Sequence, residues 1–97
     1  MAKYHLSKKA VTDLAEIWNY TCHKWSQEQA DKYYLSLIDD CEKLAYNPLI
    51  GKAYSEISYG LLGYISGKHI IFYLTISEKE IEVVRILHGR MDLNHKF

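Results

Sequence analysis

Apolar residues recur at three- and four-residue steps through the first half of the chain, in two separate runs. This spacing places the side chains of each run on one face of an α-helix, so the pattern predicts two helices. The first stripe consists of Val11, Leu14, Ala15, Trp18, Cys22 and Trp25. The second consists of Ala30, Tyr33, Tyr34, Leu37, Ile38, Cys41, Leu44 and Ala45. These two stripes predict one half of the core.

Polar residues mark where the two helices begin and end. Ser7 can cap the amides of the first helix, which the pattern extends from residue 8 to residue 25. Ser26 followed by Gln29 forms a capping box for the second helix. That helix should end at Asn47, because Pro48 disfavours helical geometry in the residue before it. Since almost no residues separate the helices, they should form an antiparallel hairpin.

The second half of the chain is rich in β-branched and aromatic residues, which favour strands. The predicted strands cover residues 61–66, 69–77 and 81–88. Short polar segments separate them, so the three strands should form an antiparallel meander. A further short strand is expected at residues 2–6. The predicted fold class is therefore α+β, in the order strand, helix, helix, three-strand meander, with the helical hairpin packed on the sheet.

Length and charge limit the chain to one small soluble domain spanning residues 1–97. The 97 residues are 48% apolar and 25% charged, which is enough for one core and not for two. The 12 Lys and Arg residues balance the 12 Asp and Glu residues. Non-specific nucleic-acid binding needs an excess of positive charge, so any contact with phosphates must come from a local patch.

The sequence predicts a cytoplasmic protein that does not contact a membrane. Charged residues stand near the start of the chain, where a secretory signal would need an apolar run. Cys22 and Cys41 lie outside any CxxC spacing and fall on the helix stripes, which is typical of reduced core thiols. Residues 57–77 carry one formal charge, but glycines and polar residues interrupt them throughout, and a hairpin explains them better than a membrane span.

The closing segment from Ile81 to Asp92 resembles the C-terminal end of the ParE family of toxins, found in bacterial toxin–antitoxin pairs. The resemblance covers essentially the whole chain. Its other parts are Tyr4, Leu6-Ser7, Ala10, Asp13-Leu14, Ile17 to Tyr20, Asn47 to Lys52 and Gly67 to Tyr73. It implies the RelE/ParE superfamily fold, inhibition of bacterial DNA gyrase, and neutralisation by a cognate antitoxin that binds the toxin. A higher toxin–antitoxin oligomer is a further arrangement that the resemblance leaves open.

The end of the last predicted strand holds the residues expected to contact gyrase or gyrase-bound DNA. They are Arg85, His88, Arg90, Met91 and Asp92. From Arg85 onward the chain carries three bases, one acid and two histidines, so this segment is locally basic. The residues after Gly89 lie beyond the strand, where packing demands less of side chains and binding roles are more common.

Arg85 also has a structural interpretation. Strict alternation along this strand places its residues on two faces, with Val83, Arg85 and Leu87 on one and Val84, Ile86 and His88 on the other. Arg85 could then form an ion pair with an acid of the first helix, such as Asp13 or Glu16. The sequence leaves the structural and the binding roles of Arg85 equally open.

A second hypothesis is enzymatic, because sister families on the same fold cleave messenger RNA at the ribosome. Such cleavage needs groups that transfer protons and a cation beside the phosphate. His88, Arg85 and His69 are the candidates, with Lys52 and Glu56 as further ones. The sequence contains no clear catalytic constellation, and the primary expectation is a toxin without catalytic residues.

A third hypothesis is a non-toxic family member that only binds its antitoxin. Members of the family commonly carry arginine where this chain has Lys52, Leu62 and Leu74, so the basic patch is thinner here.

Aromatic residues are the expected contacts with the antitoxin, because a two-helix layer on one side of a sheet leaves an edge strand and a sheet face for a partner. The candidates are Trp18, Trp25, Tyr54, Tyr59 and Tyr64. Trp18 and Trp25 also have a core interpretation, as do Tyr33 and Tyr34 on the second helix. Residues 13–42 include seven acidic and two basic residues. The outer face of the hairpin should therefore be acidic, and the antitoxin segment that binds it should be basic.

No metal or cofactor is expected. The chain has five histidines, but none forms a close pair at ligand spacing with a cysteine or a carboxylate.

Overall fold

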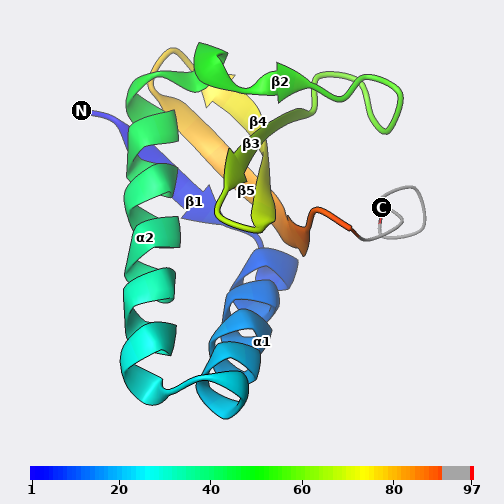
Figure 1. Ribbon diagram of the computed structural model, residues 1–97. Helices are drawn as coiled ribbons and strands as arrows, with labels where there is room; N and C mark the ends of the chain where they lie inside the picture. The colour runs from blue at the N-terminus through cyan, green and yellow to red at the C-terminus, as the bar shows by residue number, and fades with distance from the viewer. Residues whose placement is uncertain (91–96) are drawn as a thin grey trace.

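The computed structural model describes residues 1–90 and Phe97, and it shows an α+β fold (Figure 1). Its helices and strands are β1 (Lys3–Leu6), α1 (Lys8–Lys24), α2 (Gln27–Tyr46), the short 3-10 helix η1 (Pro48–Ile50), β2 (Lys52–Ala53), β3 (Leu62–Ser66), β4 (His69–Ser77) and β5 (Glu80–His88). The five strands form one sheet in the order β1-β5-β4-β3-β2. The predicted helical hairpin and meander are confirmed, and β2 is an addition that the sequence pattern did not predict.

Both helices begin at the predicted caps. The Oγ atom of Ser7 accepts a hydrogen bond from the amide of Ala10 at 3.0 Å, and the Oγ atom of Ser26 accepts one from Gln29 at 3.1 Å. These bonds satisfy amides that a helix start leaves without an internal partner. The second helix ends at Asn47, as predicted.

β1 lies at one edge of the sheet and pairs in parallel with β5, whereas every other pairing is antiparallel. This pairing places the first and the last strand of the chain side by side. β5 therefore lies inside the sheet, between β1 and β4.

Two apolar clusters lie on opposite faces of the sheet. The larger one joins the helices to the sheet and includes Leu14, Leu37 and Tyr73, all nearly inaccessible to solvent. The second contains Phe72 with Leu61, Ile70 and Leu87, and is covered by Tyr54 and Ile57 from the connection between β2 and β3. Neighbouring residues of β4 alternate between these clusters, so both of its faces are covered, as its nearly continuous apolar character predicted.

The alternation predicted for β5 is wrong. Val83 and Ile86 belong to the larger cluster, while Val84 and Leu87 pack with the second. The reason is a bulge: Phe72 pairs with Arg85 but the next residue, Tyr73, pairs with Val83, so β5 contains one additional residue there. A bulge of this kind shifts the later side chains to the other face.

The apolar stripe predicted for α1 is rotated from the observed one. Val11, Ala15 and Trp25 are exposed, whereas Ala10, Leu14 and Ile17 form the buried face. The two stripes differ by about one residue around the helix. The observed face continues through Asp13, Trp18, Thr21 and Cys22, and it is directed toward α2 and β5. The core interpretation of Trp25 is therefore wrong.

Both cysteines are free thiols, as predicted. Cys41 is buried, and burial together with the charges of Asp40 and Glu42 raises the pKa of its thiol to about 12. Cys22 is only half-buried, so the prediction that both are core residues holds for Cys41 alone. Among residues 1–90 and 97, no helix is long and apolar enough to cross a membrane.

Candidate target-binding site at the end of strand β5

The N-terminal part of α1 takes the place of β1 beside the second half of β5. β1 pairs with β5 only as far as Val83, and the chain then turns into α1 at Ser7. The amide of Ser7 donates to the carbonyl of Val83 at 3.0 Å, and its hydroxyl donates to the carbonyl of Val84 at 2.7 Å. The edge of β5 that β1 leaves open is thus satisfied by groups from the start of α1.

Asp13 continues this role one turn further along α1. Its Oδ2 atom accepts from the amide of Ile86 at 3.0 Å and from Nε of Arg85 at 2.8 Å, and its Oδ1 atom accepts from Nη2 of Arg85 at 2.9 Å. The side chains are largely buried, with 7% exposure for Asp13 and 17% for Arg85. The hydrogen bond with Asp13 raises the pKa of Arg85 further above its ordinary value. The predicted ion pair between Arg85 and the first helix is confirmed, with Asp13 as its partner.

His69 and His88 face each other across the β4–β5 pair. They are register partners, and their ring centroids lie 5.3 Å apart at an interplanar angle of 75°. The Nδ1 atom of His69 lies 2.7 Å from the hydroxyl of Tyr33 on α2. Burial, with a smaller contribution from His88, lowers the pKa of His69 to about 4, so its ring is neutral at pH 7.

The Nδ1 atom of His88 contacts the backbone where the chain leaves the strand. It lies 3.1 Å from the amide nitrogen of Arg90, and the amide of Gly89 donates to the carbonyl of Lys68 at 3.0 Å. An amide N–H can only donate, so this Nδ1 atom is the acceptor and the neutral His88 ring carries its proton on Nε2.

A hollow of about 450 Å³ lies beside these groups, between α1 and the end of β5. Acidic, basic and apolar side chains line it together: Asp13, Glu16, Ile17, Tyr20, His69, Arg85, Ile86, Leu87, His88 and Arg90. The structure thus brings together Arg85, His88 and Arg90 with His69, as the target-binding and nuclease hypotheses required. Met91 and Asp92 lie outside the described residues. Lys52 and Glu56 do not join the cluster, because β3 and β4 separate β2 from β5 and Glu56 is exposed in the following connection.

The model of one protein family matches residues 4–93, nearly the full length of the chain. That family is described as the ParE toxin of the type II toxin–antitoxin system parDE. The chain belongs to the ParE toxin family. It is accordingly a ParE-type toxin of a type II toxin–antitoxin system.

Curated relatives align over the same length. Toxin ParE1 of Mycobacterium tuberculosis is 40% identical over 93 residues, covering 96% of this chain and 95% of the relative. Toxin ParE1 of Caulobacter vibrioides is 34% identical over 92 residues, covering 95% and 94%. A solved structure described as the chromosomal ParDE TA system from P. aeruginosa matches with a TM-score of 0.76 at 19% identity, covering 91% of this chain and 96% of that one. That match shows the fold alone, and it agrees with the predicted RelE/ParE arrangement.

The aromatic residues predicted to bind an antitoxin are spread over the helical hairpin, the connection between β2 and β3, and β3. Trp18 is on α1, and its Nε1 donates to Asp31 at 2.9 Å, whereas Trp25 is the residue that follows α1 and is 69% exposed. Tyr59 is 96% exposed in the connection between β2 and β3. Tyr54 stacks edge-on against Phe72 in the second cluster, with centroids 5.1 Å apart. Tyr64 packs against the larger cluster, and its hydroxyl accepts from Lys43 at 2.7 Å. The five residues do not form one continuous surface.

The acidic outer face predicted for the hairpin is only partly correct. Of the seven acids, five are exposed: Glu16, Glu28, Asp31, Asp39 and Glu42. Asp13 instead points inward to Arg85, and Asp40 accepts from the hydroxyl of Ser66 at 2.5 Å. Both acids fasten helices to the sheet, which periodicity alone does not reveal.

Tyr33 is the site residue that sequence reasoning missed. Its core interpretation holds in part, because Tyr33 is half-buried against the larger cluster. Its hydroxyl contacts the β3–β4 turn, where it accepts from the amide of Lys68 at 3.0 Å and lies 3.3 Å from the carbonyl of Ser66. Gly67 in this turn has a φ of +60°, and a Cβ there would lie 2.7 Å from the Tyr33 ring. The Gly67-Lys68 pair in the sequence signalled the turn but not the side chain that supports it.

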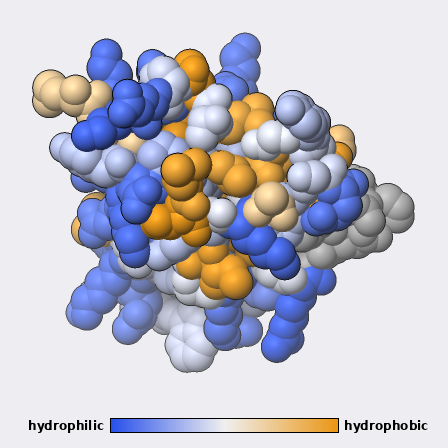
Figure 2. All heavy atoms as spheres, turned by 90° about the horizontal axis from the view of Figure 1, so that it is seen from above, coloured by the Kyte–Doolittle hydropathy of each residue, from blue (hydrophilic) through white to orange (hydrophobic). Residues whose placement is uncertain are grey.

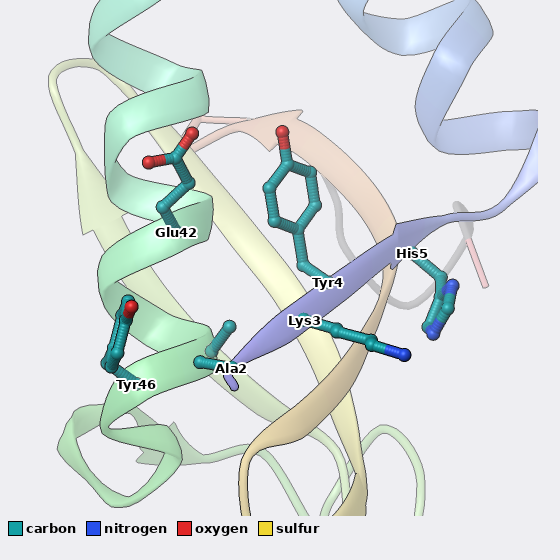
Figure 3. A pocket seen from close by; sticks show the side chains of 7 residues that line it. Ala2, Lys3, Tyr4, His5, Glu42 and Tyr46 are labelled. Carbon is teal, nitrogen blue, oxygen red and sulfur yellow. The ribbon is translucent and has the colours of Figure 1, made fainter.

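A second hollow, of about 380 Å³, lies between β1 and α2 (Figure 3). Tyr4 points into it between the strand and the helix that carries Glu42, whereas Lys3 and His5 project from the opposite side of β1. Burial raises the pKa of Tyr4. None of the predicted site residues lines this hollow. Within the described ranges, no three side chains of His, Cys, Asp and Glu are grouped so that they could hold a metal ion.

Proposed function

We propose that this ParE-type toxin inhibits bacterial DNA gyrase without catalysing a reaction, and that a cognate antitoxin neutralises it by binding in the bacterial cytoplasm. The observation that carries the proposal is the match to the ParE family from residue 4 to residue 93, which includes the whole strand β5 and the segment that follows it. Gyrase or its bound DNA is then the target of Arg90, Met91 and Asp92, with His88 at the end of the strand.

The geometry of β5 favours target binding over RNA cleavage. Arg85 forms two hydrogen bonds to Asp13, so its charge is already balanced within the fold. His69 contacts Tyr33, and its low pKa leaves it neutral at pH 7 and unable to act as a general acid there. Arg90, by contrast, is exposed and forms no ion pair among residues 1–90 and 97. Its position immediately after the strand suits it for contact with a partner.

Two surfaces support antitoxin binding. A shallow hollow of about 390 Å³ on the helical hairpin is lined by Trp18, Asp31, Tyr34 and Leu35, and its aromatic and acidic groups suit a basic, amphipathic segment. Figure 2 shows apolar side chains gathered in the middle of another face, the one seen from above, with hydrophilic side chains around them. Exposed apolar groups of this kind are typical of a surface that a partner covers.

The test of the target is DNA supercoiling by purified gyrase with the toxin added. An Arg90→Ala, Met91→Ala double variant should inhibit less than the wild-type chain, because it removes the exposed charge and the neighbouring side chain while leaving β5 unchanged. Lys79→Ala is the matched control, since it removes one exposed positive charge from the turn at the opposite end of β5.

The outcomes separate the three hypotheses. Inhibition that the double variant weakens and the antitoxin reverses supports the proposal. Growth arrest without any effect on gyrase contradicts it, and messenger RNA cleavage at the ribosome with loss of activity in His88→Ala would establish the nuclease instead. Normal growth of cells that express the chain alone would establish the non-toxic family member.

The antitoxin surface has its own test. Trp18→Ala together with Asp31→Asn should weaken the toxin–antitoxin complex measured by calorimetry, whereas Tyr46→Ala, an exposed aromatic residue in the last turn of α2, serves as the matched aromatic control. Equal affinities for wild type and the hairpin variant would place the antitoxin elsewhere.

A further inference from the structure

A series of contacting side chains extends from α2 through His69 and His88 to the backbone of Arg90, just after the end of β5. Tyr33 contacts His69, His69 lies against His88, and His88 accepts from the amide of Arg90. Each member comes from a different part of the fold: α2, β4 and the end of β5. The sheet does not need these side-chain contacts, because backbone hydrogen bonds already join β5 to its neighbour as far as the Gly89 amide, which donates to the carbonyl of Lys68.

We propose that His88 is a positioning residue that fixes the direction in which the chain leaves β5 and so presents Arg90 to its target. This inference rests on the proposed function for the role of Arg90, whereas the positioning itself is a property of the free toxin. Two adjacent bonds define the exit: the Gly89 amide donates to Lys68 at 3.0 Å, and the Arg90 amide donates to His88 at 3.1 Å. Fixing two successive peptide groups restricts the backbone of the exit residue before it meets a partner, which lowers the entropy lost on binding.

The other two members hold the His88 ring in place. His69 presents its ring nearly perpendicular to that of His88, which limits rotation of the His88 side chain. Tyr33 in turn fixes His69 through the contact at Nδ1, and it is itself held by the amide of Lys68. The arrangement therefore transmits the position of α2 to Arg90 through contacts that have defined geometry.

The hydrogen bond to Arg90 dictates which substitution should preserve the function of His88. The oxygen of an asparagine side chain can occupy the place of the imidazole Nδ1 atom, whereas glutamine extends toward the place of Nε2 and alanine offers no acceptor. His88→Asn should therefore keep the exit geometry, while His88→Gln and His88→Ala should lose it. A catalytic histidine would instead lose activity in all three variants, since neither an amide side chain nor alanine can transfer a proton.

The experiment measures amide hydrogen exchange at Arg90 by NMR in the full-length chain, with gyrase inhibition measured in parallel. His88→Ala and His88→Gln should increase exchange at Arg90 by about two- to tenfold, the range that corresponds to the loss of one hydrogen bond. His88→Asn should stay near wild type, and Tyr33→Phe should give a smaller increase. The ¹⁵N shifts of His88 should show an unprotonated Nδ1 atom in the wild type. His23→Ala is the matched control, because His23 is an exposed histidine in the last turn of α1.

Exchange at the buried amides of Ile71 and Ile86 shows whether each variant remains folded. Unchanged exchange at Arg90 in a folded His88→Ala variant would overturn the proposal, as would an Asn variant that behaves like alanine. A rise in the concentration needed for gyrase inhibition in the Ala and Gln variants alone would support it. If the wild type does not inhibit gyrase, the proposed function fails, but the exchange pattern at Arg90 still decides whether His88 positions it.

Discussion

Among substitutions that remove one charged side chain near the surface, Asp13→Ala should destabilise this small toxin most. Its carboxylate accepts three hydrogen bonds, two from Arg85 and one from the amide of Ile86, at distances between 2.8 and 3.0 Å. Alanine removes all three acceptors at once. It leaves a buried amide without a partner and a guanidinium, 17% exposed, without its counter-charge.

The magnitude follows from these two losses. An unsatisfied buried amide costs about 1–3 kcal/mol. Breaking a buried ion pair by removing one partner costs about 3–5 kcal/mol, but a pair that solvent partly reaches costs much less. We therefore expect Asp13→Ala to lower the free energy of unfolding by about 2–4 kcal/mol, against a total of roughly 5–15 kcal/mol for a domain of this size. Asp13→Asn keeps one acceptor oxygen for Ile86 and should lose about half as much.

Urea denaturation of the wild type, Asp13→Ala, Arg85→Ala and the double variant provides the assay. The double-mutant cycle should give a coupling energy of about 1–3 kcal/mol, because the two side chains contact each other directly. Glu16→Ala is the control, since this exposed acid of the same helix should change stability by less than about 0.5 kcal/mol. Additive effects of Asp13 and Arg85, or a loss at Asp13 no larger than that at Glu16, would refute the reasoning.

Three further changes test other parts of the fold. Gly67→Ala should lower the free energy of unfolding by about 1–3 kcal/mol, because the position has a φ of +60° and the new Cβ would press on Tyr33, and thermal unfolding measures it. Tyr73→Phe removes a buried hydrogen bond of 2.6 Å to the carbonyl of Pro48 and should cost about 1–2 kcal/mol in the same assay, whereas no loss would show that water replaces it. Stability should also fall as the pH is lowered from 6.5 toward 4, because the depressed pKa of His69, about 4, means that the unfolded chain binds a proton that the folded one does not. The full pKa shift of His69 corresponds to roughly 3 kcal/mol in the free energy of unfolding, and partial exposure of the ring reduces the expected loss to about 1–2 kcal/mol. A His69→Gln variant should lack this part of the pH dependence.

The elements that sequence could predict are those fixed by neighbouring residues. Ser7 and Ser26 cap the helices through bonds to amides three residues away, and Gly67-Lys68 marks a two-residue turn. Such signals act over one turn of the chain, so the sequence contains them completely. Helix order, strand order along the chain and the fold class follow from them.

The features that the sequence did not predict depend on residues far apart along the chain. β1 pairs in parallel with β5, about 77 positions away, and local alternation says nothing of that pairing. The additional residue in β5 opposite Phe72 reverses the faces of the residues that follow, and only the register with β4 reveals it. The rotation of the α1 stripe has the same origin, because Asp13 joins the buried face through its hydrogen bonds to Arg85 and Ile86, more than 70 positions away.

The candidate site shows the same division. The basic segment at the end of the chain was visible in composition, and so was the alternative that Arg85 pairs with Asp13. Tyr33 was not visible, because its contact with His69 spans 36 positions and an aromatic residue on a helix stripe is typical of a core. Sequence patterns find the charges of a site more readily than the side chains that hold them in position.

The different environments of Arg85 and Arg90 separate two roles within one basic segment. Arg85 lies before the end of β5, where the strand edge needs a partner after β1 has ended, and Asp13 satisfies both the guanidinium and the neighbouring amide. A charge already balanced in this way contributes to a partner's binding only if the fold gives up its own bond, so it is poorly suited to recognition. Arg90 lies beyond the strand, and among residues 1–90 and 97 only its backbone is tied to the fold, through His88. We therefore infer that Arg85 is required for stability and Arg90 for target recognition, although both belong to the same short stretch of sequence.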